Sequence, residues 1–303
     1  MYDVIIIGAG PSGMTAAVYT ARKKLNTLLI SKDVGGQTNW TNSIENYMGY
    51  QFIEGPELIE KFETQVKQFP IDLKIGDAVT GISLLDRGFG ILTESGQTYQ
   101  GKTAIIASGK RPRSLNVPGE EKFRGKGVSY CSICDAPLFE GMNVAVVGGG
   151  NSALEAADDL IKIGEHVYLI SLTPLTGDQV LIDKIKEALN LTLYTEHETL
   201  SISGDNFVSR ITVKDVRSNE IRDLDVKGIF VEIGLIPNSD LAKGIVPFNR
   251  LGEIEVTCDC ETVVPGLFAA GDVTSTPEKQ IIIAAGEGAK AALRAYHYLQ
   301  RLG

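Results

Sequence analysis

The chain has 303 residues, a length that suggests about two domains. Its formal net charge of −9 argues against a bare nucleic-acid or anionic-membrane surface, because phosphate groups would be repelled. No apolar run approaches the roughly 20 residues that a membrane span needs. The first residues, MYDVIIIGAG, enter a strand pattern directly without a basic leader or cleavage site, so we expect a cytoplasmic protein.

The first predicted element is a strand–turn–helix at residues 4–20, VIIIGAGPSGMTAAVYT. A β-branched run leads into Gly8-x-Gly10-x-x-Gly13, and an alanine-rich helical pattern follows. In such a motif the glycines allow a tight turn, a close approach of the backbone to phosphates, and close packing of the helix on the strand. The motif predicts a dinucleotide site with its diphosphate at the helix N-terminus.

The next feature is the pair Cys131-x-x-Cys134, followed directly by Asp135. Four cysteines are too few for a disulfide scaffold in a chain of this length. A zinc site would need a second cysteine pair nearby or histidines at ligand spacing, and Cys258-x-Cys260 lies far away in the sequence, so we expect no metal. Free cysteines are usually buried and inert, and we expect this of Cys258 and Cys260. The Cys131/Cys134 pair is left as a structural disulfide or a working redox pair.

The glycine motif returns at residues 144–160, VAVVGGGNSALEAADDL. An apolar strand again leads into Gly148-x-Gly150-x-x-Ala153, and a helical pattern follows. Two such motifs in matching contexts predict two bound dinucleotides.

A third strand–turn–helix starts at residues 266–273, GLFAAGDV, and continues into KQIIIAAGEGAKAALRAYHYL. After two dinucleotide loops, it is interpreted as the segment that brings Asp272 to the ribityl-diphosphate chain of a flavin. Because this segment follows the second motif, the simplest arrangement is one domain inserted into another.

The chain is expected to cross between the domains at 110–120 and 234–244, both polar and both bearing Pro and Gly. Lys110, Arg111 and Arg113 in the first crossing are expected to touch nucleotide or partner, or to form a solvated hinge.

Taken in order, these features resemble the low-molecular-weight thioredoxin reductases, and most closely the C-terminal reductase portion of the alkyl hydroperoxide reductase flavoprotein. The likeness runs nearly end to end, and its most specific element is the cysteine pair ahead of the second glycine loop, joined to the C-terminal Ala-Gly-Asp segment. The segments that carry it are GAGPSG (8–13), GGQ (35–37), IENY (44–47), ASGKRPR (107–113), GKGVSYCSICDAPLFEG (125–141), VVGGGNS (146–152), DQVL (178–181), FVEIGLIPN (230–238) and AAGDVTSTPEKQIIIAAGEGAKAA (269–292).

The resemblance implies an α/β fold with two Rossmann-like dinucleotide-binding domains, usually in a homodimer. An NAD(P)-binding domain of residues 111–242, which carries the cysteine pair, is inserted into a discontinuous FAD-binding domain of residues 1–110 and 243–303. The implied FAD contacts are Gly8, Gly10, Pro11, Gly13, Gln37, Asn46, Asp272, Gln280 and Ile281. The implied NAD(P) contacts are Gly148, Gly150, Asn151, Ser152 and Ser171.

The resemblance also makes Cys131 and Cys134 a redox pair that reduces a partner's disulfide, without saying which sulfur faces the flavin. Asp135 becomes the acid that protonates the leaving thiolate, with a helix or turn cap as the alternative. Electrons would pass from nicotinamide through FAD to the disulfide and then to the partner through a mixed disulfide. Nicotinamide and cysteines would take turns at the flavin by rotation of the inserted domain on its linkers.

The electron donor is set by the residues after the second apolar strand of the inserted domain, where the chain reads Ser171, Leu172 and Thr173. NADPH-type relatives carry a basic cluster here for the 2′-phosphate, and NADH-type relatives carry a carboxylate for the ribose hydroxyls. Neither signature is present. We favour NADH over NADPH, and keep as a third possibility a donor such as ferredoxin or reduced flavin, against which the intact glycine loop argues.

The alkyl hydroperoxide reductase flavoprotein has an N-terminal extension with its own redox cysteines, whereas this chain starts at the flavin-binding strand. The expected partner is therefore a separate thioredoxin or glutaredoxin-like protein. The rival interpretations are a peroxide-forming NADH oxidase with idle cysteines, a flavin- or nucleotide-sensing module without turnover, and a ferredoxin–nicotinamide reductase, which shares the architecture but has no need of the cysteines.

Overall fold

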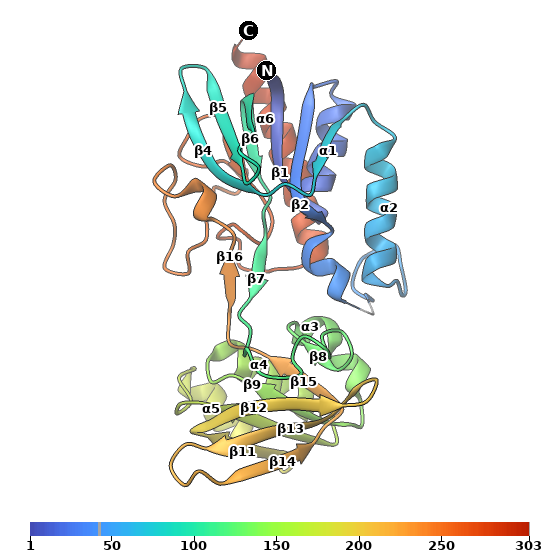
Figure 1. Cartoon of the computed structure of the whole chain (residues 1–303), viewed down its shortest axis with the longest axis vertical. Coiled ribbons are helices and arrows are strands. Elements are labelled where there is room, and N and C mark those ends of the chain that lie inside the picture. The colour runs from blue at the N-terminus through green and yellow to red at the C-terminus, as the bar shows by residue number, and fades with distance from the viewer. Residues whose placement is uncertain (42–43, 303) are drawn as a thin grey trace. The chain divides into compact units, whose positions relative to one another are not determined.

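The computed structural model describes residues 1–41 and 44–302, and the chain divides into two compact units (Figure 1). Unit 1 comprises Met1–Arg111 and Ile236–Gly303, and unit 2 is the intervening Pro112–Leu235. One α/β unit is thus inserted into the sequence of another.

The second crossing between the units lies at residues 235–236, seven residues earlier than the boundary expected from the sequence. Residues 236–242 belong to unit 1 because Ala242 is fully buried in its core, in one cluster with Ile5, Ile7 and Ile254. The first crossing differs from the expected boundary by one residue, Arg111.

Unit 1 is built on a seven-stranded mixed sheet in the order β3-β2-β1-β6-β5-β4, with β17 also paired to β6. The pairs among β3, β2, β1, β6 and β17 are parallel, and β5 pairs antiparallel with β4 and β6. The strands are β1 (Tyr2–Ala9), β2 (Thr27–Val34), β3 (Asp72–Ile75), β4 (Val79–Leu85), β5 (Gly88–Thr93), β6 (Thr98–Ile106) and β17 (Leu267–Ala269). The apolar runs of β1 and β6 are buried, as near-continuous hydrophobic strands in a covered parallel sheet should be.

The main helices of unit 1 are α1 (Pro11–Arg22), α2 (Gly55–Lys67) and α6 (Ile281–Leu302), with short turns η1 (Gly36–Trp40) and η3 (Asp240–Ala242). Helices α1 and α6 pack directly on each other. Their approach requires Gly288, since a Cβ at this position would lie 2.0 Å from the carbonyl oxygen of Ser12. The missing side chain at Gly288 thus allows α6 to pack closely against the first turn of α1.

Unit 2 is built on a five-stranded, all-parallel sheet in the order β11-β10-β9-β15-β8. Successive residues of β9 point to opposite faces: Val144 and Val146 pack with helices α4 and α5, and Ala145 and Val147 with a three-stranded antiparallel sheet, β12-β13-β14. The elements are β8 (Val128–Ser129), α3 (Ser132–Asp135), η2 (Ala136–Phe139), β9 (Asn143–Val147), α4 (Asn151–Ile161), β10 (His166–Ser171), α5 (Gln179–Lys186), β11 (Leu191–Thr195), β12 (His197–Gly204), β13 (Val208–Asp215), β14 (Ile221–Asp225) and β15 (Gly228–Val231).

The two linkers run as a two-stranded pair, β7 (Lys110–Pro112) and β16 (Leu235–Pro237), which can be followed in Figure 1. Just outside it, the hydroxyl of Ser108 donates to the carbonyl oxygen of Asn238 at 2.7 Å, and the Asn238 amide donates to the Ser108 carbonyl at 2.8 Å. Lys110 is buried in an ion pair with Glu253, so the expectation of a solvated hinge was wrong for this residue.

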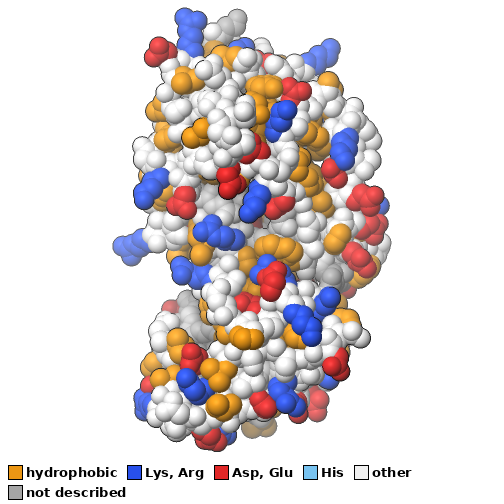
Figure 2. Space-filling model, viewed as in Figure 1, with side chains coloured by type: hydrophobic (Ala, Val, Ile, Leu, Met, Phe, Trp, Pro, Cys, Tyr) orange, Lys and Arg blue, Asp and Glu red, His pale blue; other side chains and the backbone are white. Residues whose placement is uncertain are grey.

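Figure 2 shows acidic and basic side chains interspersed over the face in view, with no extended basic patch there. Within the described ranges, no helix combines the length and apolar content that a membrane crossing requires.

Candidate functional site

The first glycine loop connects β1 to α1, and its backbone leaves room for a ligand. Gly8 has a φ of +108°, and a Cβ there would lie 2.3 Å from the carbonyl oxygen of Ala107, so only glycine fits. A Cβ on Gly13 would lie 1.8 Å from the Gly8 oxygen, whereas one on Gly10 would meet nothing within 4 Å. The loop therefore packs tightly on its inner side and is open at Gly10, the residue that caps α1.

Two polar groups near this loop have no hydrogen-bond partner in residues 1–41 and 44–302. The hydroxyl of Ser12, in the first turn of α1, is buried without a hydrogen bond, and Gly271 packs against that side chain. Asp272 follows Gly271 after β17, and its carboxyl accepts no hydrogen bond from the described part of the chain. Burial raises the pKa of Asp272, while the charges of Lys279 and Lys110 act to lower it. An open helix N-terminus, an orphaned hydroxyl and an unpaired carboxyl fit the diphosphate and ribityl groups of FAD.

The other predicted FAD residues meet this region from distant parts of the sequence. The amide of Asn46 donates to Gln280 Oε1 at 3.1 Å, and Gln280 directly precedes Ile281, the first residue of α6. Gln37 lies in η1, whose preceding Gly35 donates its N–H to the Ala9 carbonyl at the end of β1. Pro11 is the first residue of α1, where it removes no helical hydrogen bond.

Cys131 and Cys134 form a disulfide at the start of α3, just after β8. Asp135 ends this short helix, and its Oδ2 accepts a 2.6 Å hydrogen bond from the Ser129 hydroxyl. Its Oδ1 is buried without a partner. Burial raises the pKa of the Asp135 carboxyl, and the Ser129 hydrogen bond opposes that rise.

Neither α3 nor η2 has a side-chain cap, so the Asp135 carboxyl does not serve as a cap of either helix. A desolvated carboxyl with one free oxygen, one helical turn from a disulfide, is suited to hold and transfer a proton.

The second glycine loop connects β9 to α4 in the same way. Gly148 has a φ of +154°, and a Cβ there would lie 2.2 Å from the carbonyl oxygen of Glu232. Space beside Gly150 is open. The Asn151 side chain is already bound to Asp178, accepting its N–H at 2.7 Å and donating to its carboxylate at 3.1 Å.

Ser152 and Ser171 flank the second loop. The Ser152 hydroxyl donates to the Glu232 carbonyl at 3.5 Å. Ser171 ends β10 and is buried, and its Oγ is directed at Gly149, where an added Cβ would lie 2.3 Å from that oxygen. Leu172 beyond it is exposed. The Ser171 hydroxyl thus lies against the backbone of the glycine loop.

The sequence patterns did not reveal four residues at these sites: Ser12, Lys279, Glu287 and Glu232. Glu287, buried in α6, accepts the N–H of Gly271 at 2.7 Å and so orients the turn that carries Asp272. Glu232 lies next to Gly148 and α3. Its signal was a charged residue directly after an apolar run, FVEIG, but nothing in the local pattern placed it beside the glycine loop.

The remaining cysteines, Cys258 and Cys260, are free thiols. Cys260 is buried, and burial raises the pKa of its thiol to about 12, which fits an inert residue. The expectation that Cys258 is buried was wrong: it is exposed, in a segment held by isolated bridges rather than a strand.

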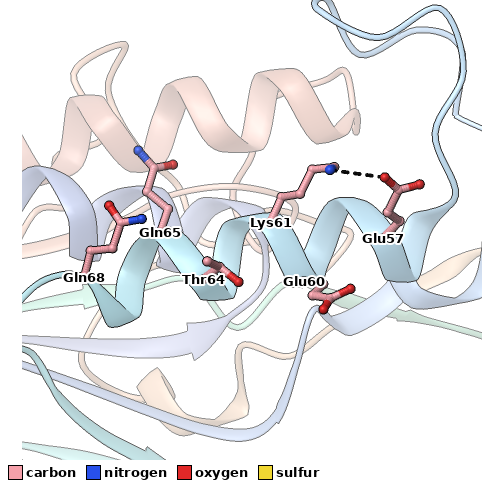
Figure 3. Close-up of a pocket in the computed structure, with 6 residues that line it drawn as sticks. All are labelled: Glu57, Glu60, Lys61, Thr64, Gln65 and Gln68. Carbon is pink, nitrogen blue, oxygen red and sulfur yellow. Dashed lines mark ion pairs between the residues drawn. The ribbon is translucent and has the colours of Figure 1, made fainter.

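A surface depression in unit 1 follows α2 and is lined by residues of that helix and by Gln68, which directly follows it (Figure 3). Lys61 pairs with Glu57 at 3.1 Å across one helical turn, and both side chains are largely exposed. Exposed ion pairs of this kind contribute little to the stability of the fold, and they indicate a helix face in contact with solvent. The residues that line it, none of them a predicted site residue, are Glu57, Glu60, Lys61, Thr64, Gln65 and Gln68.

Two glycine loops and a disulfide beside a buried acid define a class of protein, and comparison with known proteins gives the same class. The family model of pyridine nucleotide-disulphide oxidoreductases matches residues 2–288, so the chain belongs to this family of oxidoreductases. The predicted family and the predicted fold class are thus confirmed.

The particular relatives carry three different names. The structure of thioredoxin reductase from Streptococcus pyogenes MGAS5005 matches with a TM-score of 0.94 and 36% identity over 99% of both chains. NADH dehydrogenase of Bacillus subtilis (strain 168) is 44% identical over 301 residues, 99% of this chain and 59% of that protein. The alkyl hydroperoxide reductase subunit of Escherichia coli (strain K12) is 44% identical over 305 residues, 99% of this chain and 58% of that protein. The chain thus spans less than two thirds of the length of these two relatives.

Proposed function

We propose that the protein is an FAD-dependent disulfide reductase of the thioredoxin reductase type. It would take electrons from a nicotinamide dinucleotide, with NADH favoured, and use Cys131 and Cys134 to reduce the disulfide of a separate thioredoxin or glutaredoxin-like protein. The observation that carries the proposal is the Cys131–Cys134 disulfide beside the buried carboxyl of Asp135. The likeness to thioredoxin reductase over the whole chain supports it.

FAD would be held by unit 1. The N-terminus of α1 and the open side of Gly10 would receive the diphosphate, and Asp272 would accept hydrogen bonds from the ribityl hydroxyls. Asn46 and Gln280, already joined by a hydrogen bond, would stand near the ring system. When bound, FAD accepts a hydride from reduced nicotinamide and passes the electron pair to a disulfide.

The protein's own groups carry the exchange with the partner. One thiolate of the reduced pair attacks a sulfur of the partner's disulfide, forming a mixed disulfide and releasing a partner thiolate. Protonated Asp135 gives its proton to that thiolate; its raised pKa favours the protonated form it needs. The second cysteine, as thiolate, then attacks the mixed disulfide. This re-forms Cys131–Cys134 and leaves the partner with two reduced sulfurs and both electrons.

The donor would bind at the second glycine loop, with its diphosphate at Gly148, Gly150 and the start of α4. NADH is favoured because Ser171, Leu172 and Thr173 supply no cation for a 2′-phosphate. The name of the Bacillus subtilis relative, NADH dehydrogenase, supports the same choice. We also propose a homodimer, as implied by the resemblance to thioredoxin reductases, and a cytoplasmic location.

The first test is anaerobic stopped-flow mixing of the FAD-loaded protein with NADH and, separately, with NADPH, followed by the loss of the oxidised flavin absorbance. Rapid loss with NADH and much slower loss with NADPH is expected. Faster reaction with NADPH would overturn the NADH preference. No reaction with either, in protein that dithionite does reduce, would overturn the nicotinamide donor and point to ferredoxin or reduced flavin.

The second test separates disulfide reduction from oxygen reduction. Thioredoxin reduction in the presence of donor is expected to exceed peroxide formation and to require both cysteines. An NADH-dependent peroxide formation that is as fast as any disulfide reduction, and unchanged in Cys131→Ser and Cys134→Ser variants, would show an oxidase instead.

A further inference from the structure

Glu232 lies near the centre of the unit 2 sheet, and the proposed reaction assigns it no role. It follows β15 directly, and β15 lies between β8 and β9 in the parallel sheet. In the sheet register, Phe230 is paired with Ser129 of β8, and Val231 with Val147 of β9. Because parallel strands end at the same edge, the residue after β15 meets the loops that carry Cys131 and Gly148.

The contacts of Glu232 tie it to both loops. Its N–H donates to the carbonyl of Val147 at 2.8 Å, and its own carbonyl lies against Gly148. Its carboxylate Oε1 accepts the N–H of Ser132 at 3.4 Å, in the first turn of α3. The carboxyl thus lies beside the start of the cysteine helix while its backbone forms the floor of the glycine loop.

The first glycine loop has the same construction with a different residue at this place. There the N–H of Ala107 donates to the carbonyl of Ile7 at 2.8 Å, and the Ala107 carbonyl lies 2.3 Å from the Cβ position of Gly8. Ala107 in unit 1 and Glu232 in unit 2 are therefore structurally equivalent. The side chain at this position is the methyl group of Ala107 beside the first loop and the carboxyl-bearing side chain of Glu232 beside the second.

The carboxyl is titratable near neutral pH. Burial raises the pKa of Glu232 to about 7, the Ser132 and Ser152 hydrogen bonds oppose this, and the charge of Glu155 on α4 adds to it. The other charged groups on neighbouring segments are Asp135 at the end of α3 and Arg113, whose side chain lies beside the Cβ position of Gly234. The cysteines do not titrate while they are joined as a disulfide.

We propose that Glu232 makes dinucleotide binding at the second glycine loop proton-coupled: the carboxyl must hold a proton for the diphosphate to bind tightly. The inference rests on the proposed function, since it assumes that this loop receives a dinucleotide. A diphosphate at the start of α4 carries negative charge toward the Glu232 carboxyl, which interacts with the Ser152 side chain in the first turn of α4. An ionised carboxylate therefore repels the diphosphate and a neutral carboxyl does not. The first loop, with Ala107, has no such requirement.

Thermodynamic linkage between proton binding and dinucleotide binding gives the direction of the pH effect on affinity. Because the bound anion favours protonated Glu232, binding raises the carboxyl's pKa, and the protein takes up a proton when it binds near or above pH 7. The dissociation constant is expected to rise about tenfold between about pH 6 and pH 8 for a group with an unliganded pKa of about 7.

The test is calorimetric titration of the oxidised, FAD-loaded protein with ADP-ribose, whose diphosphate does not titrate in this pH range. In the wild-type protein we expect the tenfold weakening and a heat that depends on the ionisation enthalpy of the buffer, which reports proton uptake. Glu232→Gln keeps an acceptor for the Ser132 N–H and should bind with a pH-independent constant and no proton uptake. Asp159→Asn, a change of an exposed carboxylate on α4 that does not contribute to the pKa shift of Glu232, is the matched control and should keep the pH dependence.

The other possible outcomes of the titration overturn either the role of Glu232 alone or the donor site as well. ADP-ribose binding that is independent of pH in the wild-type protein, or equally pH-dependent in Glu232→Gln, overturns the inference and leaves the proposed donor site standing. No binding at any pH, in either protein, overturns the donor site and the inference together. If Glu232→Gln does not fold, proton uptake is measured in two buffers for the wild-type protein and for Asp159→Asn, and its absence from both overturns the proposal.

Discussion

The first glycine loop, Gly8–Gly13, and the second, Gly148–Ala153, join a buried parallel strand to a helix with the same backbone contacts, yet their surroundings differ. Around the first, the Ser12 hydroxyl and the Asp272 carboxyl have no hydrogen-bond partner among the residues that the structure describes. Around the second, Asn151 is already engaged by Asp178. Unsatisfied polar groups in a folded protein point to a ligand that completes them.

This difference suits a tightly held FAD at the first loop and an exchanging nucleotide at the second. A cofactor that stays bound gains from groups that only it can satisfy. A donor that binds and leaves on each cycle needs a loop that is stable without it, and the Asn151–Asp178 contact provides this. The carboxyl of Glu232 then adjusts affinity through its proton.

The largest loss of activity is expected on substitution of Cys131 or Cys134, which lie outside both glycine loops. Cys131→Ser or Cys134→Ser should lower thioredoxin-type disulfide reduction by roughly 10³-fold or more, since no second sulfur remains to release the partner. Flavin reduction by NADH, measured by stopped flow, should stay within about twofold if the two loops work independently of the disulfide. Loss of flavin reduction in the same variants would refute that independence.

Asp135→Asn should lower partner reduction by about 10²-fold, because an amide cannot give a proton to the leaving thiolate. The wild-type rate should fall as pH rises through the raised pKa of Asp135, since the protonated donor is then lost. Steady-state thioredoxin reduction against pH measures both effects. Retention of that pH dependence in Asp135→Asn would assign the proton to another group. Glu140→Gln, a change of an exposed carboxylate just after η2, is the control.

Asp272→Asn tests the contrast between the loops directly. The change removes an ionised acceptor worth about 1.5–3 kcal/mol in a hydrogen bond, so FAD should bind about 10- to 100-fold more weakly. ADP-ribose affinity at the second loop should be unchanged. Both are measured by titration of protein stripped of FAD and of reloaded protein. An unchanged FAD affinity would remove Asp272 from the flavin site.

The smallest effects concern the last position of each motif, Gly13 and Ala153. A methyl group on Gly13 would lie 1.8 Å from the Gly8 oxygen, so Gly13→Ala should destabilise the fold by about 1–3 kcal/mol. Ala153→Gly, inside α4, should cost only about 1 kcal/mol from helix propensity. Urea unfolding followed by circular dichroism compares the two. Equal stability of Gly13→Ala and wild type would mean that α1 moves away from the loop without cost.

The parts that could be predicted from sequence are those in which a short stretch is sufficient. Both glycine motifs and the Cys131/Cys134 pair were recognised because each depends on residues within a few positions of one another. The family was recognised because these motifs follow one another in order along nearly the whole chain. The insertion of one unit into another followed from the order of motifs. The second boundary was placed too late because the burial of Ala242 depends on contacts with β1, far away in the chain.

The sequence by itself determined the chemistry that is available: two turns that only glycine can form, a disulfide, and an acid next to it. Tertiary structure alone decided which distant groups meet, such as Asn46 with Gln280, Lys110 with Glu253, and Glu232 with Gly148. The physical reason is that strand order and register bring segments together across more than a hundred residues for the first two pairs. Local periodicity carries no information about such pairings, and the burial that raises the pKa of Glu232 exists only once the sheet has formed.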